Sequence, residues 1–427
     1  MSDEHHSGLL YGLEQRIPPL PAFFSALQHV LAGLVGIITP PLIIGATLGL
    51  GDWLPYLISM SLLASGIGTF LQSNRVWGIG AGMICMQGTS FAFLGVTVAG
   101  GMWVKAQGGG PQDMMAMLFG VNFVAALVPV IVSRFIEPLK KIFTPIITGS
   151  VIALIGISLI KVSVINWCGG EKAEDFASMS NIALGAGTLG VIVLLSCAKN
   201  RWLRLSSVVV GIAVGCIAAG LSGQFHLHSL GDTLFRLPTL FPFGFQFNSA
   251  IFLPVALVSL VCILEAVGDL TANSLISQQS VDDRAFRNRL KGGILADGVS
   301  CMVAAMLCAF PNTTFAQNNG VIQMTGVASR YVGRYIGVIL ILLGLFPPVG
   351  ELLRQIPAPV LGGATMVMFG CVVAAGIRII TQTPLTRRDV LIVGLAFGAG
   401  LGVESVPAFL SHFPPICSVR RPPAVGW

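Results

Sequence analysis

Charged side chains are scarce in this 427-residue chain, in which Asp, Glu, Lys and Arg together make up only 10% of the residues. A soluble domain carries roughly a quarter of charged residues. Hydrophobic residues make up 54% of the chain, and its mean hydropathy is +0.84. Disordered chains are charged and poor in aliphatic residues, so the same figures exclude them. The composition therefore predicts a polytopic membrane protein.

Three further features are missing from the sequence. Residues 1–24 contain no short apolar core that ends in a small-residue cleavage site, so no cleaved signal peptide is expected. The nine cysteines show no paired spacing, which argues against a zinc site or a disulfide framework. No His-Glu-x-x-His pair occurs, and no serine elbow stands beside a base. We therefore expect neither an enzyme nor a metal or cofactor site.

Long apolar stretches recur along the whole chain, and we count about thirteen that could cross ~30 Å of hydrocarbon. Lys and Arg concentrate on alternate connections, so that roughly seventeen of the 24 basic residues lie on one side. The positive-inside rule assigns that side, which includes the N-terminus, to the cytoplasm. Topology thus explains the formal net charge of +6, and no nucleic-acid partner is expected. The predicted location is the cytoplasmic (inner) cell membrane.

The second half of the chain looks like a copy of the first. Two apolar stretches share one Pro-Gly-Gly spacing, with Pro145, Gly149 and Gly156 in the first and Pro359, Gly363 and Gly370 in the second. The stretches "QGTSFAF" and "PNTTFAQ" are separated along the chain by nearly the same number of residues as the two Pro-Gly-Gly stretches. The copies lie about seven spans apart, an odd number, so they must have opposite orientations in the membrane. Secondary transporters use such inverted repeats and bind substrate near the midplane.

These Thr-rich stretches interrupt the apolar pattern at corresponding places in the two halves. The second leads into three consecutive amides, Gln317, Asn318 and Asn319. Non-helical backbone is tolerated at membrane depth only where protein or a water-lined cavity satisfies it. A half-helix that starts near Asn318 would aim unpaired N–H groups at whatever fills the gap. Amides can instead hold helices together, but three of them at a break favour a ligand site.

A second polar group consists of acids inside apolar stretches. Glu265 and Asp269 are four residues apart on one helix face, Asn273 is one turn further, and Asp297 lies in the next span. Carboxylates in a span normally face a cavity and mark function. Two neighbouring carboxylates in a low dielectric do not both ionise cheaply, so the pair is a candidate proton carrier. Asp269 and Asp297 could instead bond to backbone at broken helices. His29 in the first span could be a packing residue or a ligand.

The amides begin the pattern Gln-Asn-Asn-Gly, four residues, Thr-Gly at residues 317–326, which resembles the signature of the nucleobase–ascorbate transporter family. "LEAVGD" and "LADG" resemble that family's acidic motifs, and "QGTSF" resembles its broken third span. The likeness runs from about residue 18 to about residue 406, with the motifs in family order. A signature that opens with Gln and closes with Gly is most similar to the family's bacterial xanthine permeases. Uracil permeases place Glu at the opening position.

The resemblance implies an all-α polytopic fold of fourteen spans in two inverted seven-span repeats, with short strands in broken spans 3 and 10. It also implies a homodimer. The implied parts are a cytoplasmic N-terminal tail (1–22), a core domain of spans 1–4 and 8–11 (23–133 and 249–347) and a gate domain (143–222 and 357–406).

The family's site roles carry over to matching residues. Glu265 and Gln317 would bind the base, and Phe91 would stack on it. Ser90 and Asn318 would also face the substrate, although some relatives have Asn where this chain has Ser90. The supporting or proton-coupling positions would be Asp269, Asp297, His29, Asn319, Gly320 and Thr325.

The chemistry of these side chains suits a neutral purinedione, which presents N–H donors beside C=O acceptors and a flat face. The Glu265 carboxylate can accept from N–H groups, and the Gln317 amide can donate and accept on the same edge. Backbone N–H groups near Ser90 or Asn318 could meet a carbonyl. No Lys or Arg lies near either break, which argues against an anionic substrate. We therefore predict a proton-coupled purine importer, with xanthine as substrate, that works by alternating access.

The end of the chain departs from the expected repeat. Residues 407–427 form a Pro-rich tail with two adjacent arginines, too short to span a membrane. We therefore expect about thirteen spans and a missing last span of the gate domain. Two alternatives stay open: a transport-impaired homologue that still binds nucleobase, and a permease for urate or uracil.

Overall fold

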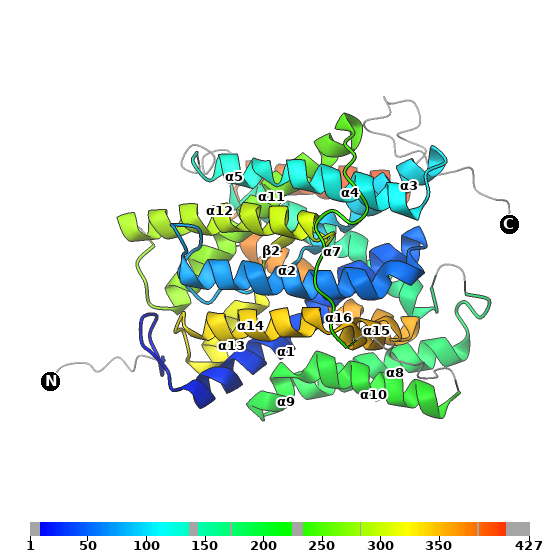
Figure 1. Ribbon diagram of the computed structural model, residues 1–427, viewed down its shortest axis with the longest axis horizontal. Helices are drawn as coiled ribbons and strands as arrows, with labels where there is room; N and C mark the ends of the chain where they lie inside the picture. Colours follow the sequence, from blue (N-terminus) through cyan, green and yellow to red (C-terminus); the bar gives the residue numbers. More distant parts are fainter. Residues whose placement is uncertain are drawn as a thin grey trace.

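The computed structural model describes residues 9–135, 144–170, 173–223, 234–281, 283–381 and 384–406. The chain is mostly helical, and its long helices run side by side (Figure 1). The predicted atypical C-terminal tail, residues 407–427, lies outside the described residues, as do residues 1–8 of the predicted N-terminal tail.

Helices account for nearly all of the regular structure in the first half. They are α1 (Pro19–Leu48), α2 (Leu54–Asn74), α3 (Leu94–Ala106), α4 (Pro111–Ala125), α5 (Leu127–Val132), α7 (Pro145–Trp167), α8 (Met179–Ser196), α9 (Arg201–Leu205) and α10 (Ser207–Leu221). Short 3-10 helices, η1 and η2, cover Gly51–Trp53 and Phe91–Phe93.

The second half is also mostly helical. Its helices are α11 (Ser249–Ile276), α12 (Arg284–Met306), α13 (Gln317–Thr325), α14 (Val332–Leu345), α15 (Pro347–Arg354), α16 (Ala358–Ile380) and α17 (Arg387–Ser405). In Figure 1, α3 to α5 lie at one edge of the molecule and α8 to α10 at the opposite edge.

Several of these helices are long and apolar enough to cross a membrane. Among the described residues there are seven such helices, or eight if the bent pair α14 and α15 is counted as one span. The two members of that pair meet at 78° because α15 begins with Pro347 and Pro348, which cannot continue the preceding ladder of hydrogen bonds. The multi-span membrane class is thus confirmed, while the count of thirteen spans stays a prediction.

Two strands interrupt the helical pattern where the sequence predicted breaks. Strand β1 (Gln87–Thr89) pairs antiparallel with β2 (Asn312–Thr314), and Gly88 lies opposite Thr313. Each strand leads into a short helix, α3 or α13. Residues 79–99 and 314–329, which are two of the roughly thirteen apolar stretches of the sequence, are therefore each part strand or coil and part helix. The two predicted strands are confirmed, and their pairing joins the two halves of the chain.

Helices α7 and α16, which carry the repeated Pro-Gly-Gly spacing, pack closely against one another. A Cβ added at Gly149 would lie 2.6 Å from the Gly376 carbonyl oxygen, and one at Gly376 would lie 2.5 Å from the Ala153 nitrogen. Small residues allow two helix backbones to approach in this way. The similar sequences of the two halves thus meet at a shared interface.

Candidate functional site

The acidic face of α11 is the starting point of the site. Glu265 and Asp269 are half-buried, and they lie close enough to each other and to Asp297 on α12 for the three carboxyls to repel one another. The Glu265 carboxylate has no hydrogen bond or ion pair within the part of the chain that the structure describes. A half-buried carboxylate without a partner is free to accept from a ligand.

Helix α13 is bound directly to this face. Asn319 Nδ2 donates to the Asp269 carbonyl oxygen at 3.2 Å, and the Thr314 hydroxyl donates to Asp269 Oδ2 at 3.3 Å. These contacts place Asn319 against Asp269, which lies one turn along α11 from Glu265. Asp269 therefore bonds to side chains of the second break, and its role as a supporting residue stays a prediction.

Asn318 is buried and bonds to backbone. Its Nδ2 donates to the Ile84 carbonyl at 2.6 Å, and Asn273 Nδ2 donates to the same oxygen at the same distance. The N–H of Asn318 itself donates to the Phe315 carbonyl oxygen at 3.1 Å at the start of α13, so it is not one of the unpaired N–H groups expected near this residue, and that expectation for its neighbours stays a prediction. A three-residue turn at the helix start satisfies this one group.

Gln317 and Gly320 mark the open side of the site. Gln317 is exposed, although strand β2 just before it is fully buried. A Cβ added at Gly320 on the same helix would meet nothing within 4 Å. Gln317 can therefore offer both the carbonyl oxygen and the NH2 group of its side-chain amide to a ligand.

The first break contributes Ser90 and Phe91. Ser90 is buried with its hydroxyl 3.8 Å from Cys262 Sγ on α11, one turn from Glu265. Its backbone N–H donates to the Pro311 carbonyl oxygen at 2.9 Å, so the groups near Ser90 that could meet a substrate carbonyl do not include this N–H. The half-buried Phe91 ring contacts Phe369 on α16 edge to face, with centroids 5.1 Å apart.

Asp297 is held by two glutamines that the sequence reading missed. Gln72 Nε2 on α2 and Gln87 Nε2 on β1 donate to Asp297 Oδ1 at 2.8 and 2.7 Å. Gln72 also donates to the Gly293 carbonyl and accepts from the Ala81 N–H. Asp297 thus joins α12 to α2 and β1 through side-chain hydrogen bonds. The alternative considered from the sequence was a bond to backbone at a broken helix. The signal in the sequence was a glutamine in each of two predicted membrane spans.

Two further candidates differ in their surroundings. His29 on α1 is 1% exposed, and Asn318 lies beside its ring, yet neither ring nitrogen has a well-aligned hydrogen bond to any described residue. A packing histidine would be satisfied, so this ring is available to a water or a ligand. Thr325 instead closes its own helix, since its hydroxyl donates to Val321 and accepts from the Val327 N–H.

Together these residues make up a candidate polar site on α1, α11 and α13, in which the hydrogen bond from Asn319 to Asp269 joins α13 to α11. It offers an unpaired carboxylate, an exposed amide and, from the first break, an aromatic ring. Flat heterocycles that carry both N–H and C=O groups match this combination.

Comparison with known proteins gives the same direction. Residues 21–409 match the model of a permease family, the nucleobase–ascorbate transporters. The chain belongs to this family.

Its curated relatives are permeases. It is 43% identical to the xanthine permease XanQ of Escherichia coli (strain K12), over 97% of this chain and 90% of that protein. It is 41% identical to XanP of the same strain, over 97% and 91%. It is 33% identical to the uric acid-xanthine permease of Emericella nidulans, over 94% and 76%.

Solved structures confirm the fold class alone. The transmembrane domain of the cyanobacterial bicarbonate transporter BicA superposes with a TM-score of 0.66 at 16% identity, covering 93% of this chain and 99% of that one. The murine anion transporter Slc26a9 gives 0.58 at 13% identity, over 95% and 67%.

Proposed function

We propose that this protein imports purine nucleobases, with xanthine as its main substrate, by proton symport across the cytoplasmic membrane. The observation that carries the proposal is the unpaired Glu265 carboxylate beside the amide helix α13, in a chain 41–43% identical to xanthine permeases. The absence of Lys and Arg from both breaks argues for a neutral substrate.

The proposed binding mode uses three side chains. Glu265 accepts from N–H groups on one edge of the base, and the exposed Gln317 amide donates to a neighbouring carbonyl. Phe91 contacts the flat face. Ser90, Asn318 and Asn319 hold the surrounding backbone, since their polar groups are bonded to Cys262, Ile84 and Asp269.

Transport in this proposal is movement of the core domain, 23–133 and 249–347, against the gate domain, 143–222 and 357–406. The contact of Phe91 with Phe369 supports this division because it joins a core break to a gate helix. The paired strands β1 and β2 support two inverted repeats within the core. The homodimer and the cytoplasmic N-terminus stay predictions.

Proton coupling is assigned to the acidic cluster. The three carboxyls repel one another, so binding of a proton by one of them relieves repulsion and changes the charge of the site. His29, buried and without an aligned partner, would take part in the same network.

Uptake of labelled xanthine by cells that express the protein tests the substrate assignment. Unlabelled xanthine, urate, guanine, hypoxanthine and uracil are added as competitors. We expect xanthine to compete best. Dominant competition by urate or uracil would select the corresponding alternative. Xanthine binding to purified protein without any uptake would select a transport-impaired homologue.

A further inference from the structure

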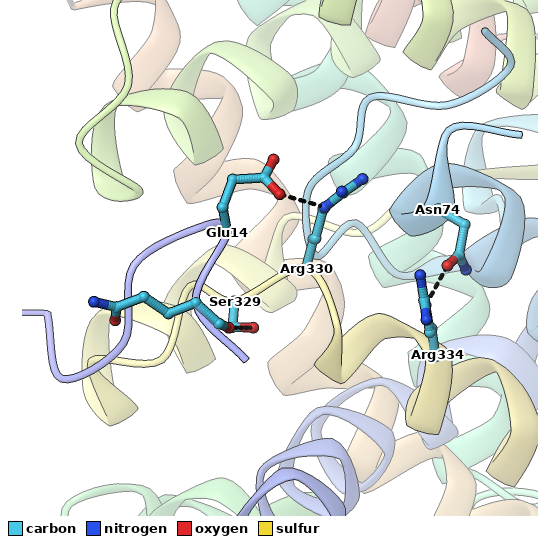
Figure 2. A network of polar contacts seen from close by, with 6 residues as sticks. Glu14, Asn74, Ser329, Arg330 and Arg334 are labelled. Atoms are coloured by element: carbon cyan, nitrogen blue, oxygen red, sulfur yellow. Dashed lines mark hydrogen bonds and ion pairs between the residues drawn. The ribbon is translucent and has the colours of Figure 1, made fainter. Parts of the chain in front are cut away.

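The segment before α1, residues 9–16, lies along the connection between α13 and α14, residues 326–331. Figure 2 shows Glu14 and Ser329 at this contact, with Arg334 on α14 facing Asn74 at the end of α2. These two segments are about 315 positions apart in sequence, so the contact was invisible to sequence reasoning.

Backbone hydrogen bonds hold the two segments together. The N–H groups of Leu10 and Tyr11 donate to the Gly326 carbonyl at 2.7 and 3.1 Å. In the other direction, the Ala328 N–H donates to the Tyr11 carbonyl at 2.9 Å, and the Arg330 N–H donates to the Leu13 carbonyl at 3.0 Å. Tyr11 and Val327 form a parallel β-bridge. The alternating pattern is that of a short parallel ladder.

Side-chain contacts reinforce this ladder at the end nearer α1. Leu13 is 4% exposed and packs in a hydrophobic cluster with Leu290 and Ile294 of α12. Arg330 Nε lies 2.9 Å from Glu14 Oε2, and the Ser329 hydroxyl donates to the Gln15 carbonyl.

Tyr331 gathers three guanidinium groups at the same place. Those of Arg16, Arg330 and Arg334 lie 5.7, 5.4 and 5.0 Å from its ring centroid. Hydrogen bonding by Arg16, and then by Arg330, lowers the pKa of Tyr331. The segment is therefore fastened through its backbone, its core contact and its charges.

The position of this ladder matters because of what it adjoins. Helix α13 has nine residues and carries all three amides of the site. A helix this short is marginal by itself, so its placement depends on contacts at its ends. At its start, the Phe315 N–H donates to the Met86 carbonyl at 3.0 Å beside β1. At its end, Gly326 adopts φ of 71° and receives the N-terminal segment.

We infer that residues 9–16 are a clamp that positions the C-terminal end of α13, and through it Gln317 and Asn318, for substrate binding. Tyr11, Leu13 and Glu14 are thus positioning residues that do not touch substrate. The segment is followed by α1, whose His29 lies beside Asn318. Residues 9–16 therefore contact the candidate site from two directions, through α1 and through the C-terminal end of α13. This inference rests on the proposed function.

The sharpest test replaces Leu10 by proline. Its side chain is 72% exposed, so little packing is lost, while proline removes the N–H that donates to Gly326. Leu10→Ala is the matched control, because it keeps the N–H. We expect Leu10→Pro to raise the KM for xanthine by about three- to tenfold at unchanged membrane abundance, as the loss of one or two hydrogen bonds implies. Leu10→Ala should stay within about twofold.

Charge exchange gives a second, independent variant. Glu14→Arg and Arg330→Glu should each raise the KM up to about fivefold, as expected for a partly exposed pair. The double exchange should restore it. This pair decides the question if Leu10→Pro protein does not accumulate in the membrane. The clamp is disproved if Leu10→Pro matches Leu10→Ala, or if the double exchange is no better than the single variants.

Limited trypsin digestion separates this inference from the proposed function. Loss of the ladder should speed cleavage after Arg330 in Leu10→Pro membranes relative to Leu10→Ala, whatever the substrate. If neither the wild-type protein nor Leu10→Ala takes up xanthine, the proposed function fails. Faster cleavage would then still support the clamp, and equal cleavage would overturn it.

Discussion

At the scale of single residues, two acids of the candidate site differ in their hydrogen-bond partners. Asp297 accepts from two glutamine amides, whereas Glu265 has no partner within the described residues. A fully paired carboxylate fixes structure, and an unpaired one is available to a ligand. A carboxylate thus serves as a candidate binding group on α11 and as an anchor on α12.

Replacing Glu265 by glutamine tests the binding role. The variant keeps the shape and one acceptor oxygen, but it loses the charge and replaces the other acceptor oxygen by an NH2 donor, and a hydrogen bond to a charged group contributes about 1.5–3 kcal/mol. We expect xanthine affinity to fall roughly 10- to 100-fold in a binding assay on purified protein. Glu351→Gln is the control, because Glu351 makes only a loose surface pair with Arg354 at 3.8 Å. Equal affinities for the two variants would remove Glu265 from the site.

Replacing Asp297 tests the anchor. Asp297→Ala leaves the amide donors of Gln72 and Gln87 without their acceptor, which costs about 1–3 kcal/mol for each unsatisfied buried group. Asp297→Asn keeps an acceptor oxygen and should lose less. We expect the thermal unfolding temperature in detergent to fall in the order wild type, Asp297→Asn, Asp297→Ala. Asp52→Ala, at an exposed position, should leave it unchanged.

At the scale of elements, the paired strands enclose one aromatic ring. Phe315, just after β2, is packed so tightly that a Cβ added at Gly88 on β1 would lie 2.2 Å from its Cζ. On α1, a Cβ at Gly36 would lie 2.7 Å from the same ring. The ring therefore has glycines on two sides and little room to move, which fixes the distance between α1 and the two breaks.

Glycine substitutions separate this contact from the open side of the site. Gly88→Ala overpacks the ring, and overpacking typically costs 1–3 kcal/mol. We expect a lower unfolding temperature and a loss of uptake for Gly88→Ala. Gly320→Ala places its methyl group in open space and should unfold at the wild-type temperature or slightly above it. A lower unfolding temperature for Gly320→Ala than for Gly88→Ala would contradict the tight packing of Phe315 against Gly88.

At the scale of the whole molecule, the proposed division into core and gate would make transport a relative movement of these two parts. Phe91 and Phe369 meet across that proposed division, and the closely packed helices α7 and α16 lie within the gate. Close backbone packing favours movement of the gate as one body. The acids proposed to carry protons all lie in the proposed core.

Proton symport predicts how uptake depends on the proton gradient. Xanthine uptake should rise as external pH falls and should collapse when a protonophore is added. Replacing sodium by potassium in the medium should leave it unchanged. Uptake that survives the protonophore but needs sodium would contradict the assignment of the acidic cluster to proton carriage.

Much of this arrangement was predictable from the sequence. The apolar lengths gave the membrane class, and the Thr-rich breaks gave two strands that the structure confirms. The amides and acids were singled out because polar groups in apolar stretches are costly. The backbone partners of Ser90 and Asn318, which are Pro311 and Phe315, could not be predicted, because they depend on the local path of the chain.

What the sequence alone determined is whatever depends on neighbours along the chain: hydrophobic length, charge alternation, and the residues that interrupt them. Tertiary structure alone decided which distant groups meet. Gln72 reaches Asp297 across 225 positions, and the segment around Leu10 pairs with the end of α13. Composition and periodicity report the cost of burying a group, whereas its partner is chosen by the packing of helices far apart in the chain.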